Sequence, residues 1–544
     1  MQMSDVCKHP ISGLLISDIK LTLDEGEQSA IDEARLRLKR AGVNPAQLCF
    51  CIYKKSIDAR KKNDIRLVYS VAAYADEPFF ADAQKLAKHG IKEHTNEDIK
   101  IELGECPLKA PPLVVGMGPA GMLAALLLAE NGYAPIVIDR GDSVAERCRV
   151  NRRFIEDGTL DTESNIQFGA GGAGTFSDGK LMTRINDPKI SYVLRRFFEF
   201  GAPEAILTSA RPHIGTDNLV KMVDNLLSHV ERSGGKVIYR CRLDGIRENA
   251  SGTLTAYTTK GTFECSSIIL APGHSARDTY KMLMDSGYAI DAKAFSVGVR
   301  VEHKREDIDR ALYGDMAGHP ALGSAEYHLA DTRGERGVYT FCMCPGGTVV
   351  AGASEEGGVV VNGMSNYKRD GENSNSAVLV SVTREDYGGT PTAAIEFQRR
   401  IERAAYRAGG SDFCAPVQTL GDFMNGKCGT EPTSVRPSYR DGRVRCADMS
   451  GVLPDFVNEG LKRGFASFDK KLAGFADPRA VITAAETRTS APVRILRGED
   501  MTAIGHSLIY PCGEGAGYAG GITSAAVDGV RAALAFMKRF APIG

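Results

Sequence analysis

The chain lacks several features that would assign it to a membrane or to nucleic acid. No apolar run approaches the ~18 residues that a helix needs to cross a bilayer, and the N-terminal stretch MQMSDVCKHP lacks the basic-then-apolar order of a secretory signal. Net charge is also nearly absent, because 67 Lys and Arg face 68 Asp and Glu. We therefore expect a cytoplasmic protein with no membrane partner, and the charge balance argues against a nucleic-acid partner.

Cysteine is present, but without a pairing pattern. Thirteen cysteines are scattered along the chain, and an odd number without a paired framework predicts reduced thiols. Cys342 and Cys344 alternate on an expected strand and would share one face. A thiol pair or half of a metal site are alternatives, but no second pair stands at ligand spacing. Core packing is therefore favoured, and no metal site is expected.

The segment 112–140 carries the strongest signal in the sequence. An apolar run at 113–115 leads into Gly116-x-Gly118-x-x-Gly121, and an apolar helical pattern and a second apolar run follow. In this strand, turn, helix and strand, the first glycine makes the turn and the second admits a pyrophosphate. The third glycine lets the helix pack close to the sheet. The pattern predicts a dinucleotide-binding unit.

The end of the second apolar run indicates which dinucleotide is bound. Asp139 lies 139 − 121 = 18 residues beyond the last glycine, where a carboxylate can accept the hydroxyls of an unphosphorylated ribose, as in NAD or FAD. The helix N-terminus, with Pro119 and Ala120, offers N–H groups to the phosphates. Further candidates for the pyrophosphate, with ordinary surface charges as the alternative, are Arg140, Arg147, Arg152 and Arg153.

A second glycine-rich stretch, FGAGGAGTFSDGKL, covers residues 168–181. Five glycines in fourteen positions are incompatible with a helix or a regular strand, and they favour a loop lying flat against a planar ligand. A flexible linker is the alternative, but the nearby Phe168, Phe176 and Leu181 argue against it. The residues expected to contact the cofactor from this loop are Gly171, Gly172, Gly174, Thr175, Ser177 and Lys180.

A chain of 544 residues is too long for one core and should divide into about three units. Residues 1–105 are expected to form an α+β domain with strands at 14–21, 48–53 and 65–74 and helices at 26–42 and 78–90. A closing strand near 99–103 would complete a ferredoxin-like sandwich. The cofactor-binding α/β domain would cover 106–290 and resume at 481–544, around an inserted α+β substrate domain at 291–480.

The N-terminal domain contains a basic run, KKSIDARKKNDIR, at 54–66. Such a run can dock an acidic protein partner or RNA. The alternative is a solvated hairpin loop, which we favour because no aromatic platform of the RNA-binding kind accompanies it.

Three later stretches should return to the cofactor. The segment 236–246 reads as one strand in which Leu243 would face an adenine edge, and an apolar strand at 268–271 ends in Pro272 and Gly273. A third strand ends at Pro511, and a long helix begins near 521. A helix N-terminus at this point would stabilise negative charge on a reduced ring by roughly 0.3 to 2 kcal/mol. The contacts expected from the closing turn are Glu514, Gly515, Gly521 and Ile522.

Three side chains are candidates for catalysis. Arg488 and Arg494 lie in the seam between the inserted and cofactor-binding domains, where a guanidinium can hold a substrate carboxylate or an enolate. An interdomain ion pair is the equal alternative. His274 follows the strand at 268–271 and is an acid/base candidate by position, although a capping or exposed histidine is favoured.

Together these motifs resemble a known group of flavoproteins. The fingerprint with Asp139, the IILAPG strand at 268–273 and GEGAGYAGGI at 513–522 resemble the glutathione-reductase-type FAD fold. The stretches GAGTFSDGKL (172–181), FCMCPGG (341–347), NGMSNYKRDGENSNSA (362–377) and ETRTSAPVRI (486–495) look more narrowly like the bacterial uncharacterised FAD-dependent dehydrogenases, related to HI0933-like flavoproteins. The resemblance implies noncovalent FAD, with Glu514 where the wider fold has an aspartate.

The chemistry that these features predict is a hydride transfer between flavin N5 and a small organic substrate. The sequence holds one dinucleotide fingerprint and no Cys-x-x-x-x-Cys, which argues against a two-nucleotide disulfide reductase. NAD(P)H would therefore act only as a transient electron donor. Two alternatives are a flavoprotein that binds or modifies RNA through its N-terminal domain and a flavin-bound scaffold without turnover.

Overall fold

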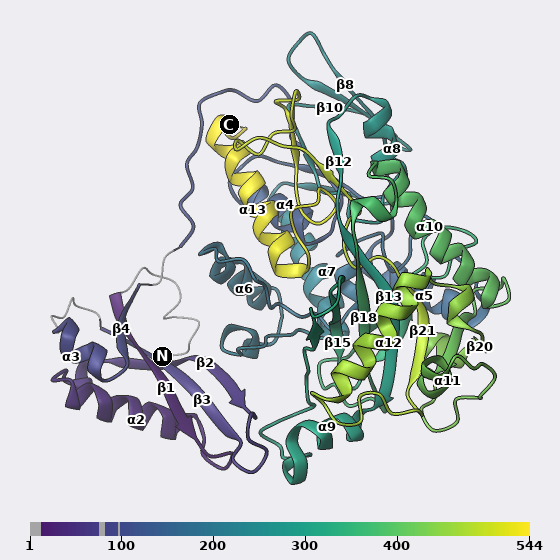
Figure 1. Cartoon of the computed structure of the whole chain (residues 1–544). Helices are drawn as coiled ribbons and strands as arrows, with labels where there is room; N and C mark the ends of the chain where they lie inside the picture. Colours follow the sequence, from purple (N-terminus) through teal and green to yellow (C-terminus); the bar gives the residue numbers. More distant parts are fainter. Residues whose placement is uncertain (1–11, 76–81, 96–97, 544) are drawn as a thin grey trace.

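The computed structural model describes residues 12–75, 82–95 and 98–543. Figure 1 shows a small N-terminal domain set apart from a larger body, in which a central domain and an inserted domain lie against each other. The N-terminal stretch on which the signal-peptide prediction rests lies outside the described residues. Within the described ranges, no helix combines the length and apolar character needed to cross a bilayer.

The N-terminal domain is a four-stranded antiparallel sheet in the order β2-β3-β1-β4. Its helix α2 buries Ala30, Ala34 and Leu38, which lie four residues apart on one stripe. The prediction of a closing strand near 99–103 is wrong, because the fourth strand is β4 at Ile91–Thr95. The ferredoxin-like assignment stays a prediction. The elements are β1 (Ser12–Leu21), α2 (Glu27–Arg40), β2 (Cys49–Asp58), β3 (Arg66–Tyr74), α3 (Ala83–Lys88) and β4.

The basic run of this domain is partly strand and partly loop. Strand β2 extends to Asp58, so Lys54 and Lys55 belong to the sheet, and only the exposed stretch 59–64 forms the loop. Asp58 pairs with Arg60 at 2.5 Å, which offsets some of the charge. The Lys55 backbone also bonds to the backbone of Thr208 and Ala210 at 2.7 and 2.8 Å and so joins this domain to the central one.

The central domain is built on a five-stranded parallel sheet in the order β23-β11-β5-β6-β7. Its strands are short apolar runs because the sheet is covered on both faces. Helices α4, α6, α7 and α13 pack on one face, and α8 and the three-stranded sheet β8-β9-β10 pack on the other. The elements are β5 (Leu113–Val115), α4 (Pro119–Glu130), β6 (Ile136–Ile138), α5 (Val144–Asp157), α6 (Lys189–Glu199), α7 (Thr216–Arg232), β7 (Lys236–Ile238), β8 (Leu243–Glu248), β9 (Leu254–Thr258), β10 (Gly261–Cys265), β11 (Ile268–Leu270), α8 (Arg277–Asp285), β23 (Ile509–Pro511) and α13 (Ile522–Arg539).

The stretch 236–246, expected to be one strand, forms two strands in different sheets. Strand β7 ends at Ile238 and β8 begins at Leu243. Between them Arg240 takes a positive φ of 51°, which turns the chain out of the parallel sheet. The guanidinium of Arg240 binds the carboxylates of Asp142 and Asp161, and these distant partners are not visible in the local pattern.

The inserted domain is built on a seven-stranded sheet in the order β14-β15-β18-β13-β21-β19-β20. Strand β21 pairs with both β13 and β19 in the middle of this sheet, so the inserted domain continues beyond the predicted boundary at 480. Strands β12 and β22 pair where the chain leaves and re-enters the central domain. The elements are β12 (Ile290–Ala292), β13 (Phe295–Lys304), α9 (Arg305–Tyr313), β14 (Ala330–Asp331), β15 (Val338–Cys344), β16 (Thr348–Ala351), β17 (Val361–Met364), β18 (Asn373–Val382), α10 (Pro391–Ala408), β19 (Ala415–Thr419), α11 (Leu420–Asn425), β20 (Val444–Cys446), α12 (Asp455–Asp469), β21 (Val481–Glu486) and β22 (Val493–Ile495).

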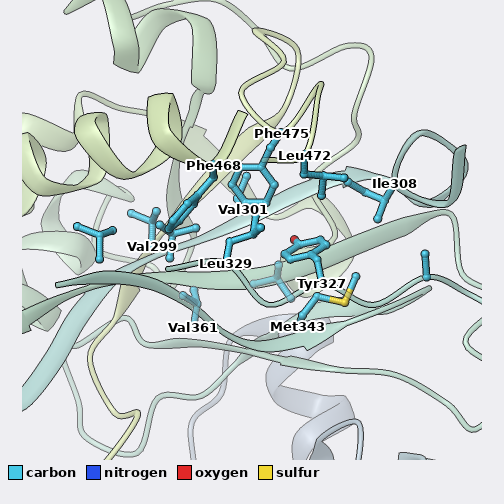
Figure 2. Packing of buried hydrophobic residues seen from close by; sticks show 14 of the residues in the cluster. Val299, Val301, Ile308, Tyr327, Leu329, Met343, Val361, Phe468, Leu472 and Phe475 are labelled. Atoms are coloured by element: carbon cyan, nitrogen blue, oxygen red, sulfur yellow. The ribbon is translucent and has the colours of Figure 1, made fainter. Parts of the chain in front are cut away.

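Helix α12 covers the inserted sheet and closes its core. Figure 2 shows Phe468, Leu472 and Phe475 over Val299 and Val301 of β13. The helix can lie close to the sheet because two of its own glycines, Gly460 and Gly464, face the strands. A Cβ at Gly464 would stand 2.5 Å from Val338 Cγ1, and a Cβ at Gly460 would stand 2.9 Å from Val380 Cγ1. This face of the inserted sheet is thereby filled by its own core.

Candidate functional site

A cavity of about 310 Å³ lies where the carboxyl ends of the parallel strands meet the inserted domain. Such strand ends are where open α/β sheets bind ligands, and the volume lies at the lower end of the range of small-molecule sites. On the central-domain side it is lined by Val115, Ile138, Ala271 and Cys512, which end or follow β5, β6, β11 and β23. On the other side it is lined by Phe341, Cys342, Asn362, Glu486, Arg488 and Thr489.

The three fingerprint glycines occupy three different environments. Gly116 has a φ of +97°, and a Cβ there would overlap the carbonyl of Ala271. A Cβ at Gly121 would overlap the carbonyl of Gly116, which sets the close approach of α4 to the turn. A Cβ at Gly118 would meet nothing within 4 Å, although Gly118 lines the cavity. The turn therefore leaves an open cradle at the position where a pyrophosphate is expected.

Two helix N-termini face this cavity without a capping side chain. Gly118 is the N-cap residue of α4 and Gly521 is that of α13, and neither helix has a side-chain hydrogen bond at its N-cap. Both glycines line the cavity, with Pro119, Ala120 and Ile522. The uncapped N–H groups and the positive dipole ends form an anion-binding wall. These features fit a ligand that carries phosphate at one end and a ring that gains negative charge at the other.

Asp139 and Arg140 both line the cavity, but their side chains are already engaged. The Asp139 carboxylate accepts hydrogen bonds from the backbone N–H of Met117 at 2.8 Å and of Gly141 at 2.9 Å. These two bonds fix the orientation of the carboxylate and leave further lone pairs for ribose hydroxyls. Arg140 forms ion pairs with Glu163 and Asp278 and so bridges the central domain rather than standing as a free cation.

The glycine-rich loop lies against the cavity as expected, but not with all of its predicted residues. Gly172, Gly174, Ser177 and Lys180 line the cavity, whereas Gly171 and Thr175 do not. A Cβ at Gly171 would overlap the Thr175 hydroxyl, so both residues belong to the underside of the loop.

Arg147 supports this loop from below and does not reach the cavity. Its guanidinium is fully buried and donates to the backbone carbonyls of Asn165, Ile166, Ala170 and Gly172. Arg152 and Arg153 are exposed on α5. The interpretation of Arg147 as a pyrophosphate ligand is therefore corrected: the side chain holds the loop in shape, and burial lowers its pKa to about 10.

Lys180 brings a cation to the cavity and ties the loop to the inserted domain. Its ammonium lies 2.5 Å from the buried carboxylate of Asp178 and 3.7 Å from Glu326. Asp178 also binds the guanidinium of Arg369, on the far side of the seam. The two positive and two negative charges of these four side chains balance, and the ion pairs hold the Lys180 ammonium at the cavity wall.

The closing turn places Glu514 in the cavity lining and Gly515 behind it. A Cβ at Gly515 would stand 2.5 Å from the Gly273 carbonyl oxygen, and the Tyr280 hydroxyl donates to both carbonyls at 2.9 and 3.1 Å. Burial raises the pKa of Glu514 to about 7, so the carboxyl carries a proton for part of the time at neutral pH. Leu243, Pro272 and Gly273 also line the cavity.

The three catalytic candidates fall in different places. Arg488 and His274 line the cavity, whereas Arg494 does not. Arg494 is exposed on β22, where its guanidinium lies 5.1 Å from the ring of Tyr518. The sequence analysis expected Arg494 in the interdomain seam, but as the exposed middle residue of β22 it lies outside the cavity lining.

Arg488 belongs to a buried ion network between the two domains. Its guanidinium binds Glu402 of α10 at 3.0 and 3.1 Å, and Glu402 also binds Arg277 of α8 at 2.8 and 2.9 Å. The interdomain ion pair, one of the two interpretations of Arg488, is therefore present at the cavity wall. Burial and repulsion from Arg488 and Arg277 lower the pKa of His274 to about 3, so its imidazole is neutral at pH 7.

Two residues of the cavity wall were missed or misread from the sequence, Glu486 and Cys342. Glu486 lines the cavity and binds Arg300 of β13 through two hydrogen bonds at 2.9 and 3.0 Å. The expectation that Cys342 packs in the core is wrong, because Cys342 lines the cavity while Cys344 is buried. The cause is a bulge: Phe341 pairs with Ala377 but Cys344 pairs with Asn375, which breaks the alternation. Among the described residues, no three His, Cys, Asp or Glu side chains are grouped so that they could hold a metal ion.

Comparisons with known proteins place this site in a family. Residues 294–489 match the model "FAD-dependent protein, C-terminal domain-like", which spans the inserted domain. Residues 14–74 match a domain of unknown function, DUF8436. An uncharacterized protein of Clostridium beijerinckii is 44% identical over 533 residues, which is 96% of this chain and 98% of that protein.

Similarity to solved structures is weak and distributed over several flavoproteins. The structure of CtdE in complex with FAD covers 78% of this chain and 82% of its own at 10% identity, with a TM-score of 0.31. A thioredoxin reductase of Lactococcus lactis covers 30% of this chain at 16% identity and a TM-score of 0.18, and the match spans only 36% of that reductase. At such TM-scores these likenesses establish no shared reaction. The chain nevertheless belongs to one family with the clostridial protein, and its inserted domain makes it an FAD-dependent flavoprotein.

Proposed function

We propose that the protein is an oxidoreductase of the glutathione-reductase-type FAD fold, which transfers hydride between the flavin and a small organic substrate. The observation that carries the proposal is the meeting of two uncapped helix N-termini and the open cradle of Gly118 at one cavity. When bound, FAD supplies a ring that takes up or gives two electrons as hydride at N5. The order of the parallel sheet, in which β5 lies between β6 and β11, supports this fold.

The central domain supplies the residues that would bind the nucleotide half. The turn from Gly116 to Gly121 and the first N–H groups of α4 would hold the pyrophosphate. Asp139, oriented by its two backbone donors, would accept the ribose hydroxyls. Leu243, the first residue of β8, lines the cavity, where an adenine edge would pack. These roles need no cation from Arg147, because helix N–H groups alone bind phosphate.

The closing turn and the start of α13, which pack beside the first turn of α4, supply residues that would act on the ring and substrate. The α13 N-terminus would stabilise negative charge there by roughly 0.3 to 2 kcal/mol, and the protonated form of Glu514 can donate a hydrogen bond. Lys180 and Thr489 are cavity-facing groups that could bind a substrate oxygen. His274 is neutral at pH 7 and can only accept a proton or donate its ring N–H. Arg488 would contribute positive potential while Glu402 fixes its position.

A binding assay with matched variants tests the proposal. Gly118→Val places a side chain in the open cradle without an internal clash, so the chain should fold while losing FAD affinity by at least about tenfold, or 1.4 kcal/mol. The control is Gly451→Val, because Gly451 is exposed and its Cβ likewise meets nothing within 4 Å. Absorbance near 450 nm would report retained flavin, and circular dichroism would report folding.

The same preparation tests the reaction. Anaerobic addition of NADH or NADPH should bleach the flavin, and a panel of metabolites should then restore its absorbance. A Gly118→Val protein that keeps its full flavin content would refute the assigned phosphate turn. A wild-type protein that binds flavin but is reduced by neither nicotinamide nor substrate would refute the oxidoreductase assignment.

A further inference from the structure

Two cysteines of the inserted domain stand one behind the other at the cavity wall. Cys342 lines the cavity, and Cys344 is fully buried behind it. The bulge of β15 gives Cys342 a positive φ of 43°, which a non-glycine residue seldom adopts. The Cys344 thiol lies 3.3 Å from the Cys342 carbonyl oxygen, to which it donates a hydrogen bond. The bulge therefore turns one thiol toward the cavity and keeps the other within its reach.

A buried cation holds this pair in place. Arg300 donates to the Cys342 carbonyl at 3.0 Å, and its Nη1 lies 3.9 Å from Cys344 Sγ. Glu486 binds the same guanidinium, and a Cβ at Gly363 would overlap it. Any side chain at position 363 would therefore collide with the Arg300 guanidinium, so glycine is needed there for Arg300 to reach the two cysteines.

The charges around the pair separate the two thiols. The side-chain interaction with Cys344 and the positive charges of Arg300 and Lys180 lower the pKa of Cys342. The pKa of Cys344 is raised by its hydrogen bond with Cys342 and by burial. These opposite shifts favour Cys342 as the attacking sulfur at the cavity and Cys344 as the thiol behind it, which is the division of roles in thiol–disulfide exchange.

Solvent can reach the cavity beside this pair. Phe341 and Met182 line the cavity and are 40% and 58% exposed. Both side chains are apolar, and methionine adapts its shape to different ligands. Phe341 precedes Cys342 directly in the chain, so this exposed part of the lining adjoins the Cys342 thiol. Cys148 of α5 is half-buried like Cys342, but it does not line the cavity.

We propose that Cys342 and Cys344 form a redox-active thiol pair at the cavity wall, and that its substrate is a small disulfide. The inference rests on the proposed function, because the flavin supplies the electrons. The Cys342 thiolate attacks one sulfur of the disulfide, and the first substrate thiolate leaves. Cys344 then attacks the Cys342 sulfur, and the second substrate sulfur leaves with the proton of Cys344. Two electrons and one proton from the anionic reduced flavin restore the Cys342 thiolate and the Cys344 thiol.

Thiol trapping on the full-length protein tests the pair without relying on turnover. After equilibration in mixtures of oxidised and reduced dithiothreitol, free thiols are alkylated and the protein is mapped by mass spectrometry. We expect Cys342 and Cys344 to disappear together as one disulfide in a single two-electron transition, while Cys148 stays alkylated. Cys344→Ser should leave Cys342 free at every ratio, and Cys148→Ser should behave as the wild-type protein does.

A second measurement uses the flavin. In the reduced dithiol form, a thiolate next to the ring should add absorbance beyond 500 nm, which Cys342→Ser should abolish and Cys148→Ser should keep. Hydroxyethyl disulfide should restore the absorbance of the reduced flavin at least about tenfold faster in the wild type than in Cys342→Ser. If flavin is retained but the two thiols titrate separately, the inference is wrong and the proposed function stands. If no flavin is retained, the trapping experiment still decides whether the pair exists.

Discussion

The Glu514 carboxyl should make the stability of the protein fall as pH rises through the neutral range. Burial raises its pKa from an ordinary value of 4.5 to about 7. The folded state therefore holds this proton more tightly than the unfolded chain does, and the stabilisation is fully present only below pH 4.5. It is lost as pH rises from 4.5 through 7. At about 1.4 kcal/mol per pKa unit, the loss is at most about 3 kcal/mol, because water at the cavity screens a half-buried group.

Thermal and urea unfolding of Glu514→Gln between pH 5 and pH 8 measure this effect. Glutamine keeps the shape but cannot ionise. The free energy of unfolding of the variant should therefore exceed that of the wild type by up to about 3 kcal/mol at pH 8 and by little at pH 5. The control is Glu499→Gln, because Glu499 is exposed outside the cavity. Parallel stability curves for wild type and Glu514→Gln would show that the carboxyl is not held in its protonated form, and the reasoning would fail.

Two further predictions concern the frame around the cavity. Glu402→Gln should destabilise the protein by about 3 to 5 kcal/mol, because Arg277 and Arg488 would both lose a buried counter-ion; equal unfolding midpoints for variant and wild type would contradict it. Gly464→Ala should cost about 1 to 3 kcal/mol, since its Cβ would stand 2.5 Å from Val338 Cγ1, and urea unfolding would show no change if α12 can move away from the sheet.

Local patterns were sufficient to predict the half of the site that is built from one continuous segment. The fingerprint glycines and Asp139 lie on adjoining strand, turn and helix, and their spacing alone fixes where the cradle opens. The loop at 168–181 was predictable for a similar reason, because its glycines exclude regular structure. The same logic explains why α13 was expected near 521, since an apolar helical pattern begins there.

The other half depends on long-range partners. Arg147 and Arg140 were indistinguishable from phosphate ligands in the sequence, because their carbonyl and carboxylate partners lie elsewhere in the chain. Cys342 was misread because the sequence argument assumed that side chains alternate regularly along the strand. A bulge interrupts this alternation, and its position depends on the register of β15 against β18. The prediction against a disulfide reductase was based on the absence of Cys-x-x-x-x-Cys, a spacing that does not include Cys-x-Cys.

Hydrogen bonds connect the segment that enters the central domain to the segment that ends it. Residue Cys106 pairs with the chain after α13, accepting a hydrogen bond from Ala541 and donating one to Arg539, and the Tyr133 hydroxyl donates to the Phe540 carbonyl at 2.6 Å. Figure 1 shows the entering segment running beside the α13 end. Because entry and exit are neighbours, a cut near residue 103 would remove the N-terminal domain without breaking a strand pairing of the central sheet, and the bonds lost to the central domain would include those of Lys55. The remaining body could equally be rejoined end to end and started elsewhere, as a circular permutant.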